Sequence, residues 1–289
     1  MEIGVHGLVF TGQFDQEGVA TAVAGAQSAG FDLLEIPLMN PATFDSLAAR
    51  KVLDGSGLSV SASLGLTAQT DISSTDPHAV AAGKDTLMRC LDHLAEMGGT
   101  HLCGVIYSAM RKYGAPPTPT GIENSQRVIS EVSEEAKDRG ISVSLEVVNR
   151  YETNVFNTSR SGLRFLDGLT SADTSLHLDT YHMNIEESDM WQPVQDAGDK
   201  LGYVHIGESH RGYLGTGNVD FKAFFRALRA INFDGPVVFE SFSSAVVSEE
   251  LSNTLGIWRN LWDDSADLAA HANAFIRDTM KAIDTISFH

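Results

Sequence analysis

Four ionisable residues lie in the later part of four successive apolar runs. They are Glu146 in ISVSLEVV, Asp179 in SLHLDTYH, His205 in LGYVHIGES and Glu240 in PVVFESFS. The β-branched and apolar composition of each run predicts a buried β-strand. Because an unpaired buried carboxylate is costly, these side chains must be paired, protonated or bound to a metal.

The spacing of the four residues narrows that choice. Each follows the preceding one by about one strand–helix unit, which predicts that all four lie at a similar height at one mouth of a barrel. No strand carries a lysine or arginine at that height to neutralise the carboxylates. Three carboxylates and one imidazole suit Mn²⁺, Mg²⁺ or Co²⁺, whereas the residue types exclude a closed cysteine-rich zinc site. We therefore expect one divalent metal ion per subunit, with Glu146, Asp179, His205 and Glu240 as ligands.

The elements that must position these residues alternate along the chain. Strand-like runs alternate with amphipathic helical patterns, and several helices end in a glycine just before the next strand, as at Gly30, Gly57 and Gly140. This alternation predicts a closed (β/α)8 TIM barrel of the α/β class, as a single domain over 1–289. A doubly wound open sheet is the alternative, but it would need a glycine fingerprint after its first strand, which is absent. The predicted strands are 2–10, 31–38, 58–66, 101–108, 141–148, 175–182, 201–209 and 236–243.

One stretch breaks the alternation. Residues 243–265 form an insertion between the eighth strand and the last helix, and they are apolar for a loop at a barrel mouth, with Trp258 and Trp262 among them. A lid over the site or a subunit interface would explain this composition. Extra helices that only pack on the barrel would explain it equally well.

Composition limits the partners. The chain has 289 residues, 43% hydrophobic and 20% charged, which is typical of a globular protein. Its net charge of −18 argues against nucleic acid and anionic membranes as partners, and it is compatible with a small neutral sugar. The two cysteines, Cys90 and Cys103, are expected to be reduced thiols. No membrane-length apolar run or basic leader is present, so we expect a soluble, cytoplasmic protein.

The motifs around the four residues resemble those of the ketose 3-epimerases, the D-tagatose and D-allulose (D-psicose) 3-epimerase family of xylose isomerase-like barrels. They are SLEVVNRYE, LDTYHMNIEE, HIGESHRGYLGTGNVD and FESFS. The resemblance implies that the four residues bind the metal and that Glu152, His182 and Arg211 hold the C1–C3 end of a ketose. From the residues alone, these last three could equally be a loop charge, a surface histidine and a solvated arginine.

Epimerisation at C3 fits these residue types. The reaction removes a proton α to the C2 carbonyl and returns one to the opposite face, through an enediolate that a metal on O2 and O3 would stabilise. Glu146 and Glu240 are the expected catalytic base and acid, with roles that swap with direction. D-Fructose and D-allulose are the expected pair, with D-tagatose/D-sorbose or L-ribulose/L-xylulose as further pairs. No nucleotide cofactor is required.

The first half of the barrel is expected to shape the pocket for C4 to C6. The candidates are His6, Phe10, Glu35, Pro37, Leu66, Tyr107 and Met110. Many family members carry a tryptophan after the first strand, but none precedes Trp191 here, which leaves the sugar preference open. The remaining histidines are expected to be structural or superficial: His78, His93, His101, His177, His210 and His271.

The sequence leaves several other functions open. Hydroxypyruvate isomerase, inosose dehydratase and aldose–ketose isomerases share the barrel, and a metal-dependent sugar-binding barrel without catalysis would share the ligands. An endonuclease-IV-like enzyme would need more histidine ligands and a basic groove, which the net charge of −18 opposes. The family resemblance and the apolar 246–262 segment together favour a homodimer or homotetramer.

Overall fold

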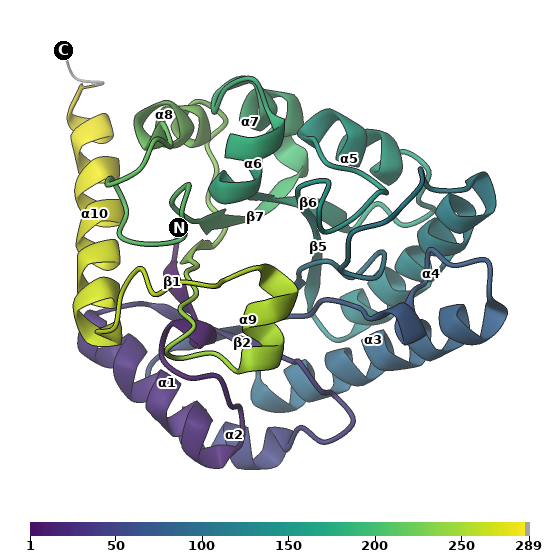
Figure 1. Ribbon diagram of the computed structural model, residues 1–289, viewed down its shortest axis with the longest axis horizontal. Coiled ribbons are helices and arrows are strands. Elements are labelled where there is room, and N and C mark those ends of the chain that lie inside the picture. The colour runs from purple at the N-terminus through teal and green to yellow at the C-terminus, as the bar shows by residue number, and fades with distance from the viewer. Residues whose placement is uncertain (287–289) are drawn as a thin grey trace.

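The computed structural model describes residues 1–286, and it contains a closed ring of eight parallel strands surrounded by helices (Figure 1). The strands follow one another around the ring in chain order, and β8 pairs with β1 to close it. The predicted (β/α)8 barrel is confirmed. The strands are β1 (Ile3–His6), β2 (Leu33–Pro37), β3 (Ser59–Ser63), β4 (His101–Cys103), β5 (Ser142–Val147), β6 (Thr174–Asp179), β7 (Leu201–Ile206) and β8 (Val237–Phe239).

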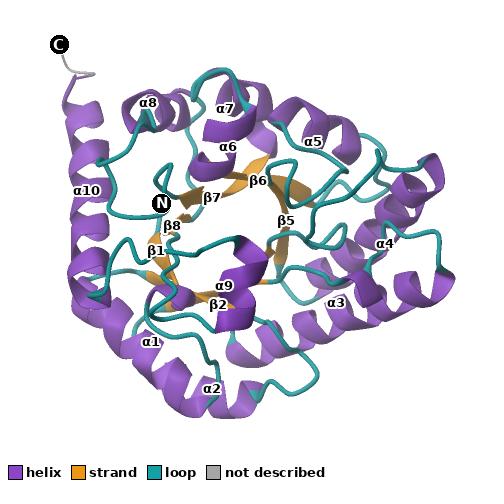
Figure 2. Cartoon of the chain, viewed as in Figure 1, coloured by secondary structure: helices purple, strands orange, loops and turns teal. Residues whose placement is uncertain are grey.

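Apart from α9, which lies in front of the barrel mouth, the helices surround the ring (Figure 2). Buried residues of the surrounding helices pack in the main core. In α8, Phe221, Phe224, Phe225 and Leu228 are buried at three- and four-residue spacing, as expected of an amphipathic helix. The helices are α1 (Gln16–Ala29), α2 (Ser46–Leu53), α3 (Pro77–Met97), α4 (Pro119–Asp138), α5 (Ser159–Leu166), α6 (Thr180–Glu186), α7 (Gln192–Ala197), α8 (Phe221–Ala230), α9 (Glu249–Leu255) and α10 (Ser265–Ile286), with 3-10 turns η1 (Gly7–Val9), η2 (Ala68–Thr70) and η3 (Gly198–Lys200).

Helix ends follow local sequence signals. The Asp15 carboxylate accepts a hydrogen bond from the Gly18 amide at the start of α1, and Gly30 ends the helix with a φ of 78°. That left-handed conformation favours glycine, so the predicted cap at Gly30 is confirmed. Gly57 also has a positive φ, but it lies in the loop after α2, whose cap is Asp54. Its prediction as a helix cap was therefore wrong.

The strands are shorter than the apolar runs that predicted them. β1 ends at His6 and continues as η1, and β4 ends at Cys103 rather than at residue 108. β6 ends at Asp179, whose carboxylate accepts a hydrogen bond from the Tyr181 amide and so begins α6. His182 therefore lies on α6, not at a strand end. The apolar residues beyond each strand are buried in turns, which the hydrophobic pattern does not distinguish from strand.

The 243–265 segment covers part of the barrel mouth. It contains α9, which lies in front of the barrel in Figure 1. Trp262 is 4% exposed, and its indole Nε1–H donates to Ser241 Oγ at 2.8 Å. Trp258, by contrast, is 79% exposed. The two tryptophans therefore have different surroundings, one anchoring the segment and the other facing outward.

Among the described residues, no helix combines the length and apolar character needed to cross a membrane. Cys90 and Cys103 are both buried, and neither forms a disulfide. This agrees with the prediction of reduced thiols.

Candidate active site and metal centre

The four predicted ligands lie close together, although Glu240 is outside the group of three whose ligand atoms are mutually within 4.8 Å. Asp179 and His205 are directly opposite each other in the β6–β7 ladder, Glu146 lies near the end of β5, and Glu240 follows β8. All four side chains are buried. His205 Nδ1 lies 3.4 Å from Glu240 Oε1 and 3.9 Å from Glu146 Oε1. Glu146, Asp179 and His205 can each offer one ligand atom within 4.8 Å of the others.

Two atoms of this cluster lack hydrogen-bond partners. Within the described chain, Asp179 Oδ2 and His205 Nδ1 are buried and accept no hydrogen bond. Buried polar atoms are normally paired, so two buried atoms without a hydrogen-bond partner in one cluster call for a ligand between them. The donor set of carboxylates and one imidazole fits a hard divalent cation.

The pKa shifts of the clustered residues also fit a site for a cation. Burial raises the pKa of Glu146 well above its usual value, although the nearby His205 opposes the shift. Burial likewise raises the pKa of Asp179 to about 7, against the charge of Arg211. Burial would lower the pKa of His205, but Glu35 and Glu240 outweigh it and raise that pKa to about 10. Without a cation, burial therefore favours protonated Glu146 and Asp179, whereas His205 and Arg211 outweigh burial at Glu240 and lower its pKa.

Arg211 supplies a positive charge that the strands do not. It lies in the loop after β7, with a left-handed φ of 61°, and its side chain is buried. Its guanidinium donates to Glu240, and Nη1 lies 3.7 Å from Asp179 Oδ2. The group also stacks on Tyr181, 3.9 Å from the ring centroid. A residue in a loop thus partly neutralises the carboxylates, whereas the sequence prediction considered only lysines and arginines on the strands. A strained backbone that holds a buried arginine here is typical of a functional site.

His182 and Glu152 complete the same side of the cavity. His182 Nε2 lies 3.6 Å from Glu146 Oε1 and 4.0 Å from Glu152 Oε2. His182 Nδ1 accepts a hydrogen bond from the Asn149 amide, so the neutral ring carries its proton on Nε2, facing the carboxylates. Burial, with the charge of Arg211, lowers the pKa of His182 well below its usual value. The imidazole is therefore a neutral hydrogen-bond donor toward the cavity.

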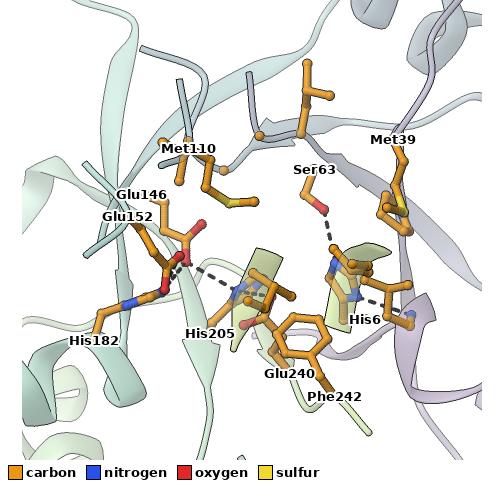
Figure 3. A pocket seen from close by; sticks show the side chains of 18 of the residues that line it. His6, Met39, Ser63, Met110, Glu146, Glu152, His182, His205, Glu240 and Phe242 are labelled. Carbon is orange, nitrogen blue, oxygen red and sulfur yellow. Dashed lines mark hydrogen bonds and ion pairs between the residues drawn. The ribbon is translucent and has the colours of Figure 1, made fainter. Parts of the chain in front are cut away.

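The cavity in front of the cluster has two unlike walls. Its volume is about 250 Å³. Figure 3 shows Glu146, Glu152 and His182 on one side, His205 and Glu240 near the middle, and His6, Ser63 and Met39 on the other side. Apolar residues complete the lining: Pro37, Met110, Phe242 and, from α9, Leu251 and Leu255. The site can therefore hold a polar reacting end and a less polar remainder of a small molecule.

The predicted residues of the first half divide into two groups. His6, Pro37 and Met110 line the cavity. Tyr107 does not, because β4 ends before it: the ring is fully buried, stacks on Phe156, and donates its hydroxyl to the Glu146 carbonyl at 2.8 Å. Leu66 lies behind the wall, in a bridge with Ala109. The placement of Tyr107 and Leu66 in the pocket was therefore wrong.

Phe10 and Glu35 also lie outside the cavity. Phe10 is wedged against α1, where a Cβ on Gly25 would lie 2.4 Å from its ring. Glu35 is fully buried beneath His205 and accepts hydrogen bonds from it and from Tyr203. Their assignment to the pocket followed from position near a strand end, which does not reveal whether a side chain lies at the surface of the mouth or below it.

Two further residues organise the site without a sequence signal of their own. Asn149 fixes the His182 ring and also donates to Glu152 at 3.0 Å. Glu208 is fully buried and accepts hydrogen bonds from the Ser209, Gly215 and Val219 amides, which shapes the loop that carries Arg211. The other histidines lie outside the cavity lining, and His177 packs under His205 with ring centroids 4.1 Å apart.

Comparison with known proteins places this arrangement in a family. Residues 23–279 match the model of the xylose isomerase-like TIM barrel family. The chain is 59% identical to a ketose 3-epimerase of Arthrobacter globiformis, over 100% of both chains. It is 52% identical to an L-ribulose 3-epimerase of a Methylomonas species, over 96% of this chain and 97% of the relative.

A solved structure agrees with these relatives. The crystal structure of a Methylomonas D-allulose 3-epimerase in complex with D-allulose matches with a TM-score of 0.95 at 52% identity, covering 96% of this chain and 97% of that one. The protein belongs to the ketose 3-epimerase family of xylose isomerase-like TIM barrels.

Proposed function

We propose that this protein epimerises free ketoses at C3, with Glu146, Asp179, His205 and Glu240 as ligands of one divalent metal ion, Mn²⁺ or Mg²⁺. The observation that carries the proposal is the convergence of these buried side chains, with buried atoms of Asp179 and His205 that lack hydrogen-bond partners in the described chain, at the end of a substrate-sized cavity. When bound, the cation would act as a Lewis acid toward the oxygens on C2 and C3.

The proton at C3 is handled by two carboxylates. Glu146 and Glu240 come from β5 and from the end of β8, so they approach the cavity from two sides (Figure 3). One carboxylate removes the proton from one face of C3, and the other returns a proton to the opposite face. The reverse reaction exchanges their roles. No redox step occurs, because the proton leaves and returns with the same oxidation state of the sugar.

The remaining polar residues orient the substrate. His182 presents its Nε2–H, Glu152 an acceptor, and Arg211 its guanidinium to the hydroxyl groups and carbonyl at C1 to C3. The apolar wall then contacts C4 to C6. Arg211 is the one lysine or arginine among the described lining residues, and it is already paired with Glu240. This supports an unphosphorylated sugar as substrate.

The choice of ketose is part of the proposal. The relatives carry names for both a ketopentose and a ketohexose substrate, L-ribulose and D-allulose. We assign D-fructose/D-allulose as the principal pair and L-ribulose/L-xylulose and D-tagatose/D-sorbose as further pairs. The same site leaves room for both lengths because the C4–C6 wall makes few directional contacts.

The test uses isotope exchange. Metal-stripped protein is incubated with D-fructose in D₂O, with and without Mn²⁺, and the sugars are followed by NMR. We expect D-allulose only with Mn²⁺, with deuterium entering at C3 alone. Deuterium at C1 with an aldose product would indicate 1,2-isomerisation, and a product lighter by one water would indicate a dehydratase. Sugar binding without exchange of any ketose would indicate a barrel that binds but does not catalyse.

We further propose that the protein is a homodimer or homotetramer. The outward-facing Trp258, at 79% exposure, supports an interface that includes the 243–265 segment. Sedimentation at micromolar concentration should show a dimer or tetramer, and a monomer alone would contradict the proposal.

A further inference from the structure

A fully buried carboxylate lies beneath the proposed metal ligands. Glu35 is on β2, 0% exposed. Its Oε2 accepts hydrogen bonds from Tyr203 at 2.7 Å and from His205 Nε2 at 2.8 Å, and its Oε1 lies 3.4 Å from His6 Nε2. Within the described chain its ion pairs are with histidines, and no lysine or arginine compensates it. An isolated buried carboxylate would be costly, so its retention here calls for a role.

The contact determines which nitrogen of His205 faces the cavity. Because Nε2 donates to Glu35, the lone pair lies on Nδ1 once the ring is neutral, as a metal ligand must be. Nδ1 is the nitrogen that lies 3.4 Å from Glu240 and 3.9 Å from Glu146 and that lacks a partner. His177 holds the plane of the ring from below, at an interplanar angle of 83°. The ring is thus oriented by one hydrogen bond and one packing contact.

A second histidine reaches the same carboxylate. His6 Nδ1 accepts the Leu8 amide, so its Nε2 faces Ser63 at 3.2 Å and Glu35. His6 also lines the cavity. Glu35 therefore accepts hydrogen bonds from His205 and Tyr203 through Oε2, whereas His6 only approaches Oε1, which has no hydrogen-bond partner in the described chain.

We infer that Glu35 is a positioning residue for the metal centre: it holds His205 in the tautomer and orientation in which Nδ1 binds the cation, and it increases the basicity of that nitrogen. This inference rests on the proposed metal site. Histidine ligands of metals commonly donate their second N–H to a carboxylate, and loss of that partner typically weakens metal binding about 10- to 100-fold.

The test measures metal binding directly. Mn²⁺ is titrated calorimetrically into metal-stripped wild-type protein and the variants Glu35→Leu and Glu35→Gln. We expect about 100-fold weaker binding for Glu35→Leu, which lacks an acceptor, and about 10-fold weaker binding for Glu35→Gln, which retains an oxygen but no charge. If Glu35→Leu does not fold, Glu35→Gln decides the question.

Asp71→Asn is the matched control. Asp71 is also buried and accepts hydrogen bonds, from Tyr113 at 2.6 Å and from the Ala109 amide, but it lies outside the cavity lining. Its loss should lower thermal stability and leave Mn²⁺ affinity unchanged. A purely structural Glu35 would behave in the same way, so unchanged Mn²⁺ affinity in both Glu35 variants would overturn the inference.

A spectroscopic readout separates this inference from the metal site itself. In the Mg²⁺-loaded wild-type protein, ¹⁵N NMR should show the His205 proton on Nε2, and in Glu35→Leu that signal should shift or broaden as the tautomer is released. Wild-type protein that binds no Mn²⁺ would overturn the metal site instead. Normal binding with a protonated Nδ1 would overturn the role of Glu35 alone.

Discussion

The two halves of the barrel have the same architecture and different contents. β5 to β7 carry Glu146, Asp179 and His205, and Glu240 directly follows β8. The segments after these strands carry Glu152 and Arg211 in loops and His182 on α6. β1 to β4 contribute an apolar wall with a few hydroxyl and imidazole groups, and only Glu35 among their buried strand residues is acidic. Under the proposed function, one half performs the chemistry while the other shapes the space around the sugar. The TIM barrel allows this because the loops and strand ends vary independently of the ring.

The largest expected effect is on the reacting half. Glu240→Gln should lower kcat about 10²- to 10⁴-fold at saturating Mn²⁺, because the amide cannot exchange a proton with C3. Steady-state kinetics with D-fructose, together with Mn²⁺ titration, would measure this. Glu17→Gln, an exposed carboxylate on α1, is the control and should be unchanged. A kcat within tenfold of wild type would remove Glu240 from proton transfer.

Metal binding should affect the two halves unequally. A cation at 100 times its Kd stabilises the folded protein by about 2.7 kcal/mol. Backbone amides that exchange only when a local opening releases the cation should therefore exchange about 100-fold more slowly. Hydrogen exchange should therefore slow in β5 to β8 and around Glu35 more than in β3 and β4. Equal protection of all eight strands would show that the barrel opens as one unit and that the halves are not separable in stability.

A substitution of Arg211 tests how the loop after β7 contributes to activity. Arg211→Lys keeps the charge but loses the planar group that contacts Glu240 and stacks on Tyr181. We expect kcat/KM to fall about 10- to 100-fold, in line with the loss of charge-assisted hydrogen bonds. Kinetic measurement with the folded variant, verified by circular dichroism, checks this. Activity equal to wild type would mean that only the charge of Arg211 matters.

The smallest effect is expected on the apolar lining that α9, in the segment after β8, adds to the cavity. Leu251→Ala removes apolar surface that α9 contributes to the cavity, so the KM for a ketohexose should rise by less than about tenfold with little change in kcat. The KM for L-ribulose, which has one carbon fewer, should change less. The exposed Leu47→Ala is the matched control. A large fall in kcat would show that α9 also takes part in orienting the reacting carbons.

The site also shows where sequence patterns stop being informative. Glu146, Asp179, His205 and Glu240 were identifiable because each is a polar residue in an apolar strand, and strands in one barrel repeat the same height. Glu35 has the same pattern in LLEIP but a different function, since it lies below the mouth and hydrogen bonds to His205. Tyr107 follows an apolar run in the same way as a cavity residue, yet the chain leaves the ladder at Cys103 and turns the ring into the core.

The order of strands and helices was determined by the sequence, because the hydrophobic period is a local property that recurs in each of eight strand–helix units. The regular spacing of those units also identified Glu146, Asp179, His205 and Glu240 as neighbours. Tertiary structure alone decided that Arg211 reaches Glu240 from a loop, that Asn149 fixes the His182 ring, that α9 borders the cavity and that Glu35 supports His205. These contacts join residues far apart in the chain or depend on a turn, and no local period encodes which side chains will meet there.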